Sequence, residues 1–259
     1  QNYSVNAFHM NKGEFYSRDI NYKSWGYDNY YGLQDIQKYN DERYVLDREL
    51  ILNKTFYNKI FKQQGNFVNY IITYSPHTPF TTEKEVGKIL AEEKYGKGNV
   101  PKLSEEDCAK MAASETDNMV GLLIQALKDN GLYDNTVIVA YADHYLYTLD
   151  DKSILDKYKE TSNNLINHTP FFIWSSDLGQ LTSISKVNMQ MDILPTVLNL
   201  FGIDYNSNNY IGHDILSNDF KGYAFFSDYS WYDGKVYVEN QQITNGKKMS
   251  TNKLDSMNN

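Results

Sequence analysis

Residues 132–145 carry the sequence LYDNTVIVAYADHY, in which an apolar run ends in polar residues. The run from Thr136 to Tyr141 is rich in β-branched residues, which favour strands. Because it is apolar at nearly every position rather than at alternate ones, it is typical of a strand buried on both faces of a helix-covered parallel sheet. Asp143 and His144 then follow directly after the predicted strand.

Helical and strand patterns alternate on either side of this stretch. Met119, Leu123 and Leu127 recur at helical spacing, and Asn130-Gly131 predicts the end of that helix. Two further runs, Tyr70–Tyr74 and Phe171–Trp174, have the same strand character as residues 136–141. A second helix is expected after Asp192, with Pro195 in its first turn and Gly202 beyond its end. The order predicts an α/β sandwich with a mainly parallel central sheet flanked by helices.

The C-terminal part of the chain has a different pattern. Residues 223–229, the turn dipeptide Asp233-Gly234 and residues 235–239 predict an antiparallel hairpin, and Asn245-Gly246 predicts another turn. We therefore expect an α/β domain over residues 1–221 and a small antiparallel sheet with a tail over residues 222–259.

Composition excludes several classes of protein. The 259 residues are 41% hydrophobic and include 23 Tyr and 12 Phe, which is incompatible with a disordered chain. The net charge of −8 argues against a nucleic-acid partner, because phosphate neutralisation requires an excess of Lys and Arg. Cys108 is the single cysteine, so no internal disulfide can form. No apolar run approaches the roughly 20 residues needed to span a bilayer.

Two of the five histidines follow predicted strands, where ligands bind in covered α/β sheets. His77 lies in Ser75-Pro76-His77-Thr78-Pro79-Phe80, and His144 follows Asp143. An adjacent carboxylate and imidazole suit Mn²⁺, Zn²⁺ or Mg²⁺. The alternative for the Asp143-His144 pair is a helix cap or an ion pair at the strand end, and spacing alone does not choose between them.

Polar and charged residues also gather near the N-terminus, where His9, Asn11, Tyr16 and Arg18 lie close together in the sequence. The guanidinium of Arg18 could bind a phosphate or sulfate through two hydrogen bonds. Taken alone, the residues favour the simpler alternative, a surface salt bridge between Arg18 and either Asp19 or Glu14.

The ordered set of these motifs resembles the alkaline phosphatase and sulfatase superfamily over roughly residues 5–240. The elements that carry the resemblance are residues 132–145, the strand at Thr169–Trp174, the helix at Asp192–Thr196 and the segment Tyr210–Asp214. Within the superfamily, residues 9–18, 26–28 and 75–80 resemble the C-terminal part of the extracellular catalytic domain of lipoteichoic acid synthases and related phosphoglycerol transferases.

The resemblance implies a role for each matching residue. Asp143 and His144 would be metal ligands, with Mn²⁺ expected and Mg²⁺ or Zn²⁺ as alternatives. His77 and Arg18 would hold the phosphate or headgroup, and the segment with His9, Asn11 and Tyr16 would line the glycerophosphate pocket. Asn11 stands where the family has an acidic residue and Tyr16 where it has Trp, so both departures bear on which headgroup is bound.

The activity implied by the resemblance is metal-dependent transfer of glycerophosphate from phosphatidylglycerol to a teichoic-acid-type polymer through a threonine-bound intermediate. The nucleophilic Thr and a metal-binding Glu are expected upstream of residue 1, so residues 1–259 alone are expected to be inactive. The enzyme is expected on the extracellular side of a bacterial membrane, tethered by an upstream segment. The alternatives are a sulfatase, phosphatase or phosphoethanolamine transferase-like enzyme of the same fold, and an inactive fragment that only binds a glycan or headgroup.

Overall fold

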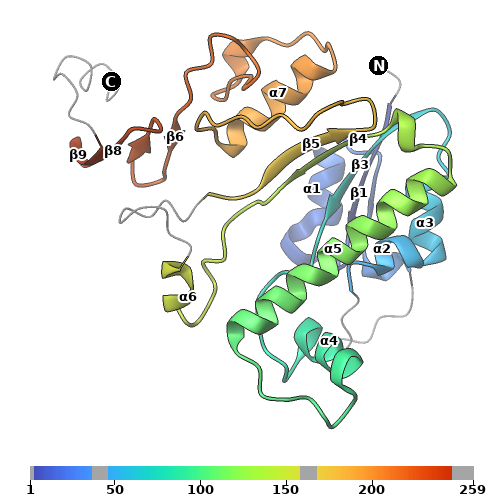
Figure 1. The fold of residues 1–259 in the computed structure, drawn as a ribbon. Coiled ribbons are helices and arrows are strands. Elements are labelled where there is room, and N and C mark those ends of the chain that lie inside the picture. The colour runs from blue at the N-terminus through green and yellow to red at the C-terminus, as the bar shows by residue number, and fades with distance from the viewer. Residues whose placement is uncertain (1–2, 37–45, 158–167, 247–259) are drawn as a thin grey trace. The chain divides into compact units, whose positions relative to one another are not determined.

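A computed structural model describes residues 3–36, 46–157 and 168–246 (Figure 1). Its contacts divide the chain into two compact units. The first unit comprises Gln1–Ala140, Leu146–Tyr158 and Phe171–Leu178, and the second comprises Tyr141–Tyr145, Lys159–Pro170 and Gly179–Asn259.

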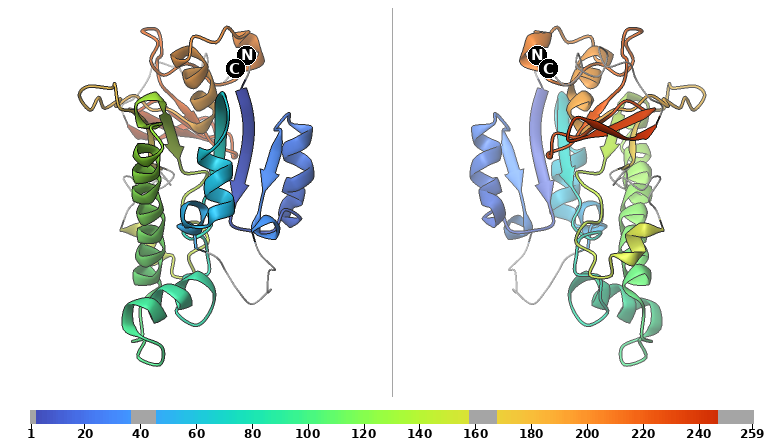
Figure 2. Two further views of the ribbon diagram at one scale, coloured as in Figure 1. Left: turned by 90° about the vertical axis from the view of Figure 1, so that its right-hand side faces the viewer. Right: turned by 90° about the vertical axis from the view of Figure 1, so that its left-hand side faces the viewer.

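The centre of the first unit is a parallel three-stranded sheet in the order β2-β1-β3 (Figure 2). Its strands are β1 (Tyr3–His9), β2 (Asn29–Tyr31) and β3 (Asn66–Ile72). The register places Asn6 of β1 opposite Asn29 of β2 and opposite Asn69 of β3. The predicted strand Tyr70–Tyr74 is therefore placed too late in the sequence. The polar residues Asn66 and Asn69 obscure its true start in the sequence; Asn69 belongs to the row of asparagines that crosses the sheet, and Asn66 lies opposite Tyr3.

Helices cover both faces of this sheet. On one face, Phe8 packs with Phe56 of α3 (Lys54–Phe61), Leu50 of α2 (Glu49–Leu52) and Met119 of α5 (Glu105–Asp129). On the other face, Ala7 packs with Tyr22 of α1 (Arg18–Ser24) and with Tyr30. Side chains alternate along a strand, so β1 supplies Phe8 to one core and Ala7 to the other.

Capping residues explain where the long helix α5 begins and ends. The Oγ atom of Ser104 accepts a hydrogen bond from the Asp107 N–H at 3.1 Å, and three acidic residues occupy the first turn, which suits the positive end of the helix dipole. Asn130 caps the C-terminal end, and Gly131 adopts the left-handed conformation with φ 65°.

The remaining helical elements of this unit are η1 (Phe15–Ser17), η2 (Leu33–Asp35), α4 (Glu85–Tyr95), η3 (Tyr133–Asn135) and α6 (Ser153–Asp156).

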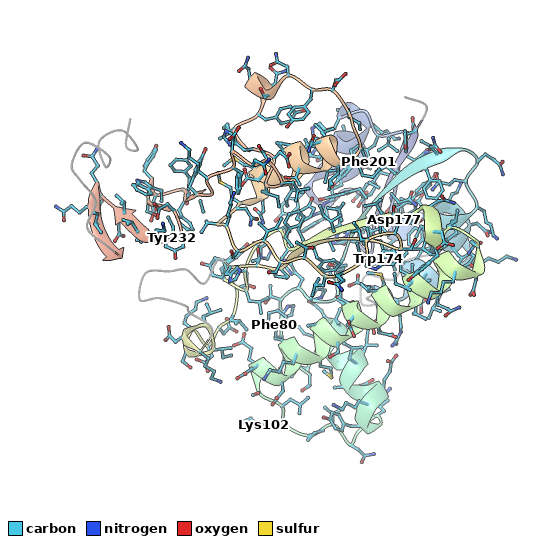
Figure 3. All side chains as sticks on the ribbon, turned by 45° about the horizontal axis from the view of Figure 1, so that its top comes forward. Phe80, Lys102, Trp174, Asp177, Phe201 and Tyr232 are labelled. Atoms are coloured by element: carbon cyan, nitrogen blue, oxygen red, sulfur yellow. The ribbon has the colours of Figure 1, made fainter. Side chains whose placement is uncertain are left out.

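The predicted strands around residues 137 and 171 form as β4 (Val137–Tyr141) and β5 (Phe171–Ser175), which pair in a two-stranded sheet. Trp174 of β5, which is labelled in Figure 3, packs its ring against that of Tyr133 with the centroids 4.9 Å apart. This contact ties β5 to the turn that leads from α5 into β4.

The second unit contains η5 (Gln190–Asp192), α7 (Ile193–Leu200), η6 (Ser207–Asn209) and a four-stranded sheet. The helix confirms the prediction from Asp192, Pro195 and Gly202, and Gly202 takes a positive φ of 60° after its end. The carboxylate of Asp192 accepts hydrogen bonds from the Met189 N–H at 2.9 Å and from the His213 N–H at 2.7 Å. Asp192 therefore joins the start of α7 to the segment that follows η6.

The antiparallel sheet has the order β6-β7-β8-β9. Its strands are β6 (Ala224–Phe225), β7 (Trp231–Tyr232), β8 (Val236–Glu239) and β9 (Gln242–Gly246). The turn between β7 and β8 contains Asp233-Gly234, as predicted. The strand that pairs with β8 across this turn is β7, however, and the predicted segment 223–229 contributes only β6, which pairs with β7.

The prediction of a turn at Asn245-Gly246 is wrong, because these residues end strand β9. The turn lies instead at Asn240-Gln241, which have φ values of 50° and 61° and connect β8 to β9. A two-residue hairpin loop needs positive φ at both central residues, and Asn tolerates that conformation.

The fold prediction is confirmed, since the chain is a mixed α/β protein with a parallel sheet, flanking helices and a small antiparallel sheet. Within the described residues, no helix is long and apolar enough to cross a membrane.

Candidate functional site

His9, the last residue of β1, is buried with 3% of its surface exposed. Its Nδ1–H donates a hydrogen bond to the backbone oxygen of Ile72 at 2.9 Å, which leaves the lone pair on Nε2. Burial lowers its pKa to about 4, and the positive charges of Arg18 and His77 act in the same direction. At neutral pH, His9 is therefore an uncharged imidazole.

His77 lies in the loop after β3 and is exposed. Its Nδ1–H donates to the backbone oxygen of Thr78 at 2.9 Å, and its ring stacks on that of Tyr74 with the centroids 6.5 Å apart. The Tyr74 ring also meets the His9 ring edge-on at 5.9 Å. Tyr74 thus connects the two histidines at the carboxyl end of the sheet.

Asp47 fixes the start of the His77 loop, a role that no local sequence pattern indicates. It is fully buried, and its carboxylate accepts hydrogen bonds from the Tyr74 N–H at 2.7 Å, the Ser75 N–H at 2.9 Å and the Thr116 hydroxyl at 3.2 Å. The Asp47 N–H in turn donates to Ser75 Oγ at 3.0 Å. Burial raises the pKa of Asp47, and these hydrogen bonds oppose the rise.

Arg18, the first residue of α1, has a buried guanidinium nitrogen, Nη1, with no hydrogen-bond partner among the described residues. Its guanidinium instead lies over the rings of Phe15 and Tyr16, at 5.8 and 5.5 Å from their centroids. The expected salt bridge to Asp19 or Glu14 does not form, so that alternative is wrong. An unsatisfied buried cationic donor suits an anionic ligand.

The segment before Arg18 presents Tyr16 to solvent. Tyr16 and Ser17 both adopt positive φ, 57° and 51°, and 73% of the Tyr16 surface is exposed. Asn11 uses its side-chain oxygen to accept a hydrogen bond from the Lys12 N–H at 2.7 Å, and its backbone oxygen accepts from the Leu33 N–H at 3.1 Å. Asn11 thereby links the end of β1 to η2.

Tyr30 is a second residue that sequence reasoning missed. Only 7% of its surface is exposed, and its hydroxyl has no hydrogen-bond partner among the described residues. Burial raises its pKa to about 12, while the nearby positive charge of Arg18 opposes the rise. Tyr30 therefore remains a neutral O–H donor near Arg18. An isolated Tyr in a short strand carries no sequence signal for this.

Asp143 and His144 belong to the second unit and follow β4. His144 Nδ1–H donates to the Tyr145 backbone oxygen at 2.8 Å, and Nε2 lies 3.7 Å from Asp143 Oδ1. The side chain of Gln190 holds this segment by donating to the backbone oxygens of Ala142 and Asp143, each at 2.7 Å.

This arrangement fits a divalent metal, because a metal-binding histidine commonly donates its other N–H to a backbone oxygen and coordinates through the remaining nitrogen. Over residues 3–36, 46–157 and 168–246, no three His, Cys, Asp or Glu side chains gather to form a complete metal site. The convergence of Asp143 and His144 with His77 and Arg18, which lie in the other unit, stays a prediction.

Comparisons with known proteins support the resemblance seen in the sequence. A lipoteichoic acid synthase of Staphylococcus saprophyticus is 30% identical over 253 residues, which are 92% of this chain and 38% of that protein. A lipoteichoic acid synthase of Staphylococcus aureus is also 30% identical, over 94% of this chain and 39% of its own length. The chain thus spans less than two fifths of these relatives.

The fold is shared with the crystal structure of the lipoteichoic acid synthase LtaP from Listeria monocytogenes, with a TM-score of 0.76 and 24% identity. That similarity covers 99% of this chain and 69% of the LtaP chain. The model of the sulfatase family matches residues 1–203, which is well over half of the sequence. By this match, the protein belongs to the sulfatase family.

Proposed function

We propose that this chain is part of an enzyme that transfers glycerophosphate from phosphatidylglycerol to a teichoic-acid-type polymer on the outer side of a bacterial membrane. The observation that carries the proposal is the buried, unpartnered Nη1 of Arg18 close to His9 and His77. The names of the similar synthases support the choice of a transferase.

The headgroup phosphate would be bound by Arg18, because its N–H groups form charge-assisted hydrogen bonds with phosphate oxygens. The Tyr30 hydroxyl is a second donor close to the same guanidinium. Neutral His9 would accept a hydrogen bond from a glycerol hydroxyl through Nε2. His77 would contact the headgroup from its exposed loop, which Asp47 holds in place.

Asp143 and His144 would help to hold a divalent cation, for which Mn²⁺ is our proposal and Mg²⁺ or Zn²⁺ the alternatives. When bound, such a cation neutralises charge on phosphoryl oxygens and lowers the pKa of a hydroxyl nucleophile. The proposed nucleophile is a threonine outside residues 1–259, which would carry the glycerophosphate before a polymer hydroxyl accepts it. Asn11 and Tyr16 would contribute to the choice of headgroup.

The test is product analysis with the complete natural protein, labelled phosphatidylglycerol and Mn²⁺. The proposal requires release of diacylglycerol together with transfer of the label to a glycerophosphate polymer. Release of sulfate from an aryl sulfate without any diacylglycerol would instead identify a hydrolase of the same family. Diacylglycerol release accompanied only by free glycerol phosphate would identify a phospholipid hydrolase and overturn the transfer step.

A further inference from the structure

A polar cleft lies on the first unit, beside strands β1 and β2 and helix α3. It encloses about 420 Å³ and contains no acidic and no aliphatic side chain among its lining residues. The lining comprises Ser4, Asn6, Asn29, Tyr31, Asn58, Lys59, Lys62, Gln63 and Gln64. Small-molecule pockets are usually apolar, so this lining indicates a ligand that is itself strongly polar.

The floor of the cleft is a network of side-chain amides. Asn6 is 3% exposed, donates to Gln63 Oε1 at 2.8 Å and to Ser4 Oγ at 3.2 Å, and accepts from Asn29 Nδ2 at 2.9 Å. Gln63 Nε2 donates to Asn69 Oδ1 at 2.9 Å. These bonds connect all three strands of the sheet to the residues after α3. The floor is therefore rigid, and further hydrogen bonds would come from the rim.

The rim carries two lysines, Lys59 and Lys62, which lie three residues apart and so share one flank of the chain around the end of α3. The Lys59 ammonium lies 5.3 Å from the centroid of the Tyr31 ring, and neither lysine forms an ion pair among the described residues. Between residues 50 and 82 the sequence contains three lysines and no acid, although the chain as a whole has a charge of −8.

Along the sequence, the acidic residue nearest to the cleft strands is Asp28, which directly precedes Asn29. Its carboxylate accepts a hydrogen bond from the Val5 N–H at 2.8 Å, so it is bound to the sheet backbone. The cleft is consequently a local basic and amide-rich site on an acidic protein. Ammonium groups attract phosphate, and amides both donate to and accept from hydroxyl groups.

The cleft is distinct from the site of His9 and Arg18. Asn6 precedes His9 by three residues on β1, which separates them by about 10 Å at the usual strand rise. Because their positions differ by three, an odd number, their side chains also leave opposite faces of the sheet. A ligand in the cleft therefore does not compete with one at His9.

We propose that this cleft is a second binding site, which takes a phosphate-bearing polyol or sugar through Lys59 and Lys62, with the amides of Asn58 and Gln64 contacting its hydroxyl groups. Its existence does not depend on the proposed transferase activity. A free polyol phosphate and one unit of a longer polymer carry the same phosphate and hydroxyl groups, so either could be the ligand.

The test is an NMR titration of the ¹⁵N-labelled chain with glycerol phosphate, with inorganic phosphate and glycerol as comparison ligands. Glycerol phosphate should shift the amide signals of Lys59, Lys62 and Gln64 and should bind more tightly than either comparison ligand. The double substitution Lys59→Gln/Lys62→Gln should weaken this binding by at least roughly tenfold, since each charge-assisted contact is worth about that much. A synthetic glycerol phosphate trimer that binds more tightly than the monomer would indicate a polymer segment, and equal affinity would indicate a free polyol phosphate.

A matched control carries Lys54→Gln/Lys88→Gln, which removes the same charge from exposed positions outside the cleft. The control and Arg18→Ala should both retain the shifts at the cleft. Loss of these shifts in the control, or their persistence in Lys59→Gln/Lys62→Gln, would overturn the proposal, as would equal affinity for inorganic phosphate and glycerol phosphate. Shifts around Arg18 that disappear only in Arg18→Ala report on the proposed transferase site, so the two proposals can fail separately.

Discussion

At the scale of single residues, Arg18 has a side chain suited to ligand binding rather than to stability. Arg18→Ala removes a buried donor that has no partner, so it should leave the free energy of unfolding unchanged or slightly higher. It should weaken phosphate binding by about 1.5–3 kcal/mol, the usual contribution of a charge-assisted hydrogen bond. Diacylglycerol release by the complete protein measures the second effect, and denaturant unfolding measures the first.

The control for Arg18→Ala is Lys23→Ala, which removes an exposed cation from the last turn of the same helix. It should leave diacylglycerol release unchanged. If Arg18→Ala instead lowers stability substantially while retaining activity, the guanidinium serves the packing of α1 and not a ligand.

The buried imidazole of His9 should make stability depend on pH. Its pKa is about 4 in the folded state against 6.5 for an unperturbed histidine, so between these values the unfolded chain binds a proton that the folded chain does not. Stability should therefore be fully present above pH 6.5 and fall as the pH drops to about 4, by on the order of 3 kcal/mol.

This pH dependence is measured by urea unfolding of the natural chain and of His9→Gln at several pH values. Arg18 and His77 are the neighbouring groups whose charge lowers the pKa of His9, so their variants provide the comparison. The natural chain should lose more stability than His9→Gln over this interval. Identical pH profiles for the two proteins would show that His9 is not the responsible group.

At the scale of elements, the loop after β3 is held by one buried carboxylate. Asp47→Asn replaces an acceptor of three hydrogen bonds by an amide whose NH₂ group faces donors, which should destabilise the chain by about 1–3 kcal/mol. At least one of the backbone amides of Tyr74 and Ser75 should also exchange faster with solvent, because they donate to different oxygens of Asp47 and asparagine keeps only one oxygen.

Asp117→Asn is the matched control, since Asp117 is exposed on α5. It should change neither the unfolding free energy nor the exchange of the loop amides. Unchanged exchange at Tyr74 and Ser75 in Asp47→Asn would contradict the role that we assign to Asp47.

At the scale of the whole molecule, residues 1–259 should bind Mn²⁺ only weakly and should not turn over a phosphodiester. A tight divalent site generally uses three or more protein ligands, whereas the described residues bring together no group of three metal-binding side chains. Calorimetric titration with Mn²⁺ measures the affinity, and His144→Ala should abolish the remaining binding. Tight binding, or turnover that His144→Ala removes, would show that the ligand set is complete within this chain.

The sequence by itself determined the elements whose signals are local. The period of Met119, Leu123 and Leu127 and the stop at Asn130-Gly131 predict α5, and the β-branched run before Asp143 predicts β4. These predictions succeeded because the interactions behind them lie within a few residues. At residues 245 and 246 a local signal failed, because cross-strand pairing with β8 outweighed the turn preference of Asn-Gly.

Only the tertiary structure decided which polar side chains are left without partners. Asp47 meets its partners across 27, 28 and 69 residues, and the isolation of Tyr30 and Arg18 Nη1 depends on what packs around them. From its sequence neighbours alone, Arg18 favoured a salt bridge over an anion site. Burial and hydrogen bonding are set by long-range packing, so chain spacing could indicate the candidate residues but not whether each already had a partner.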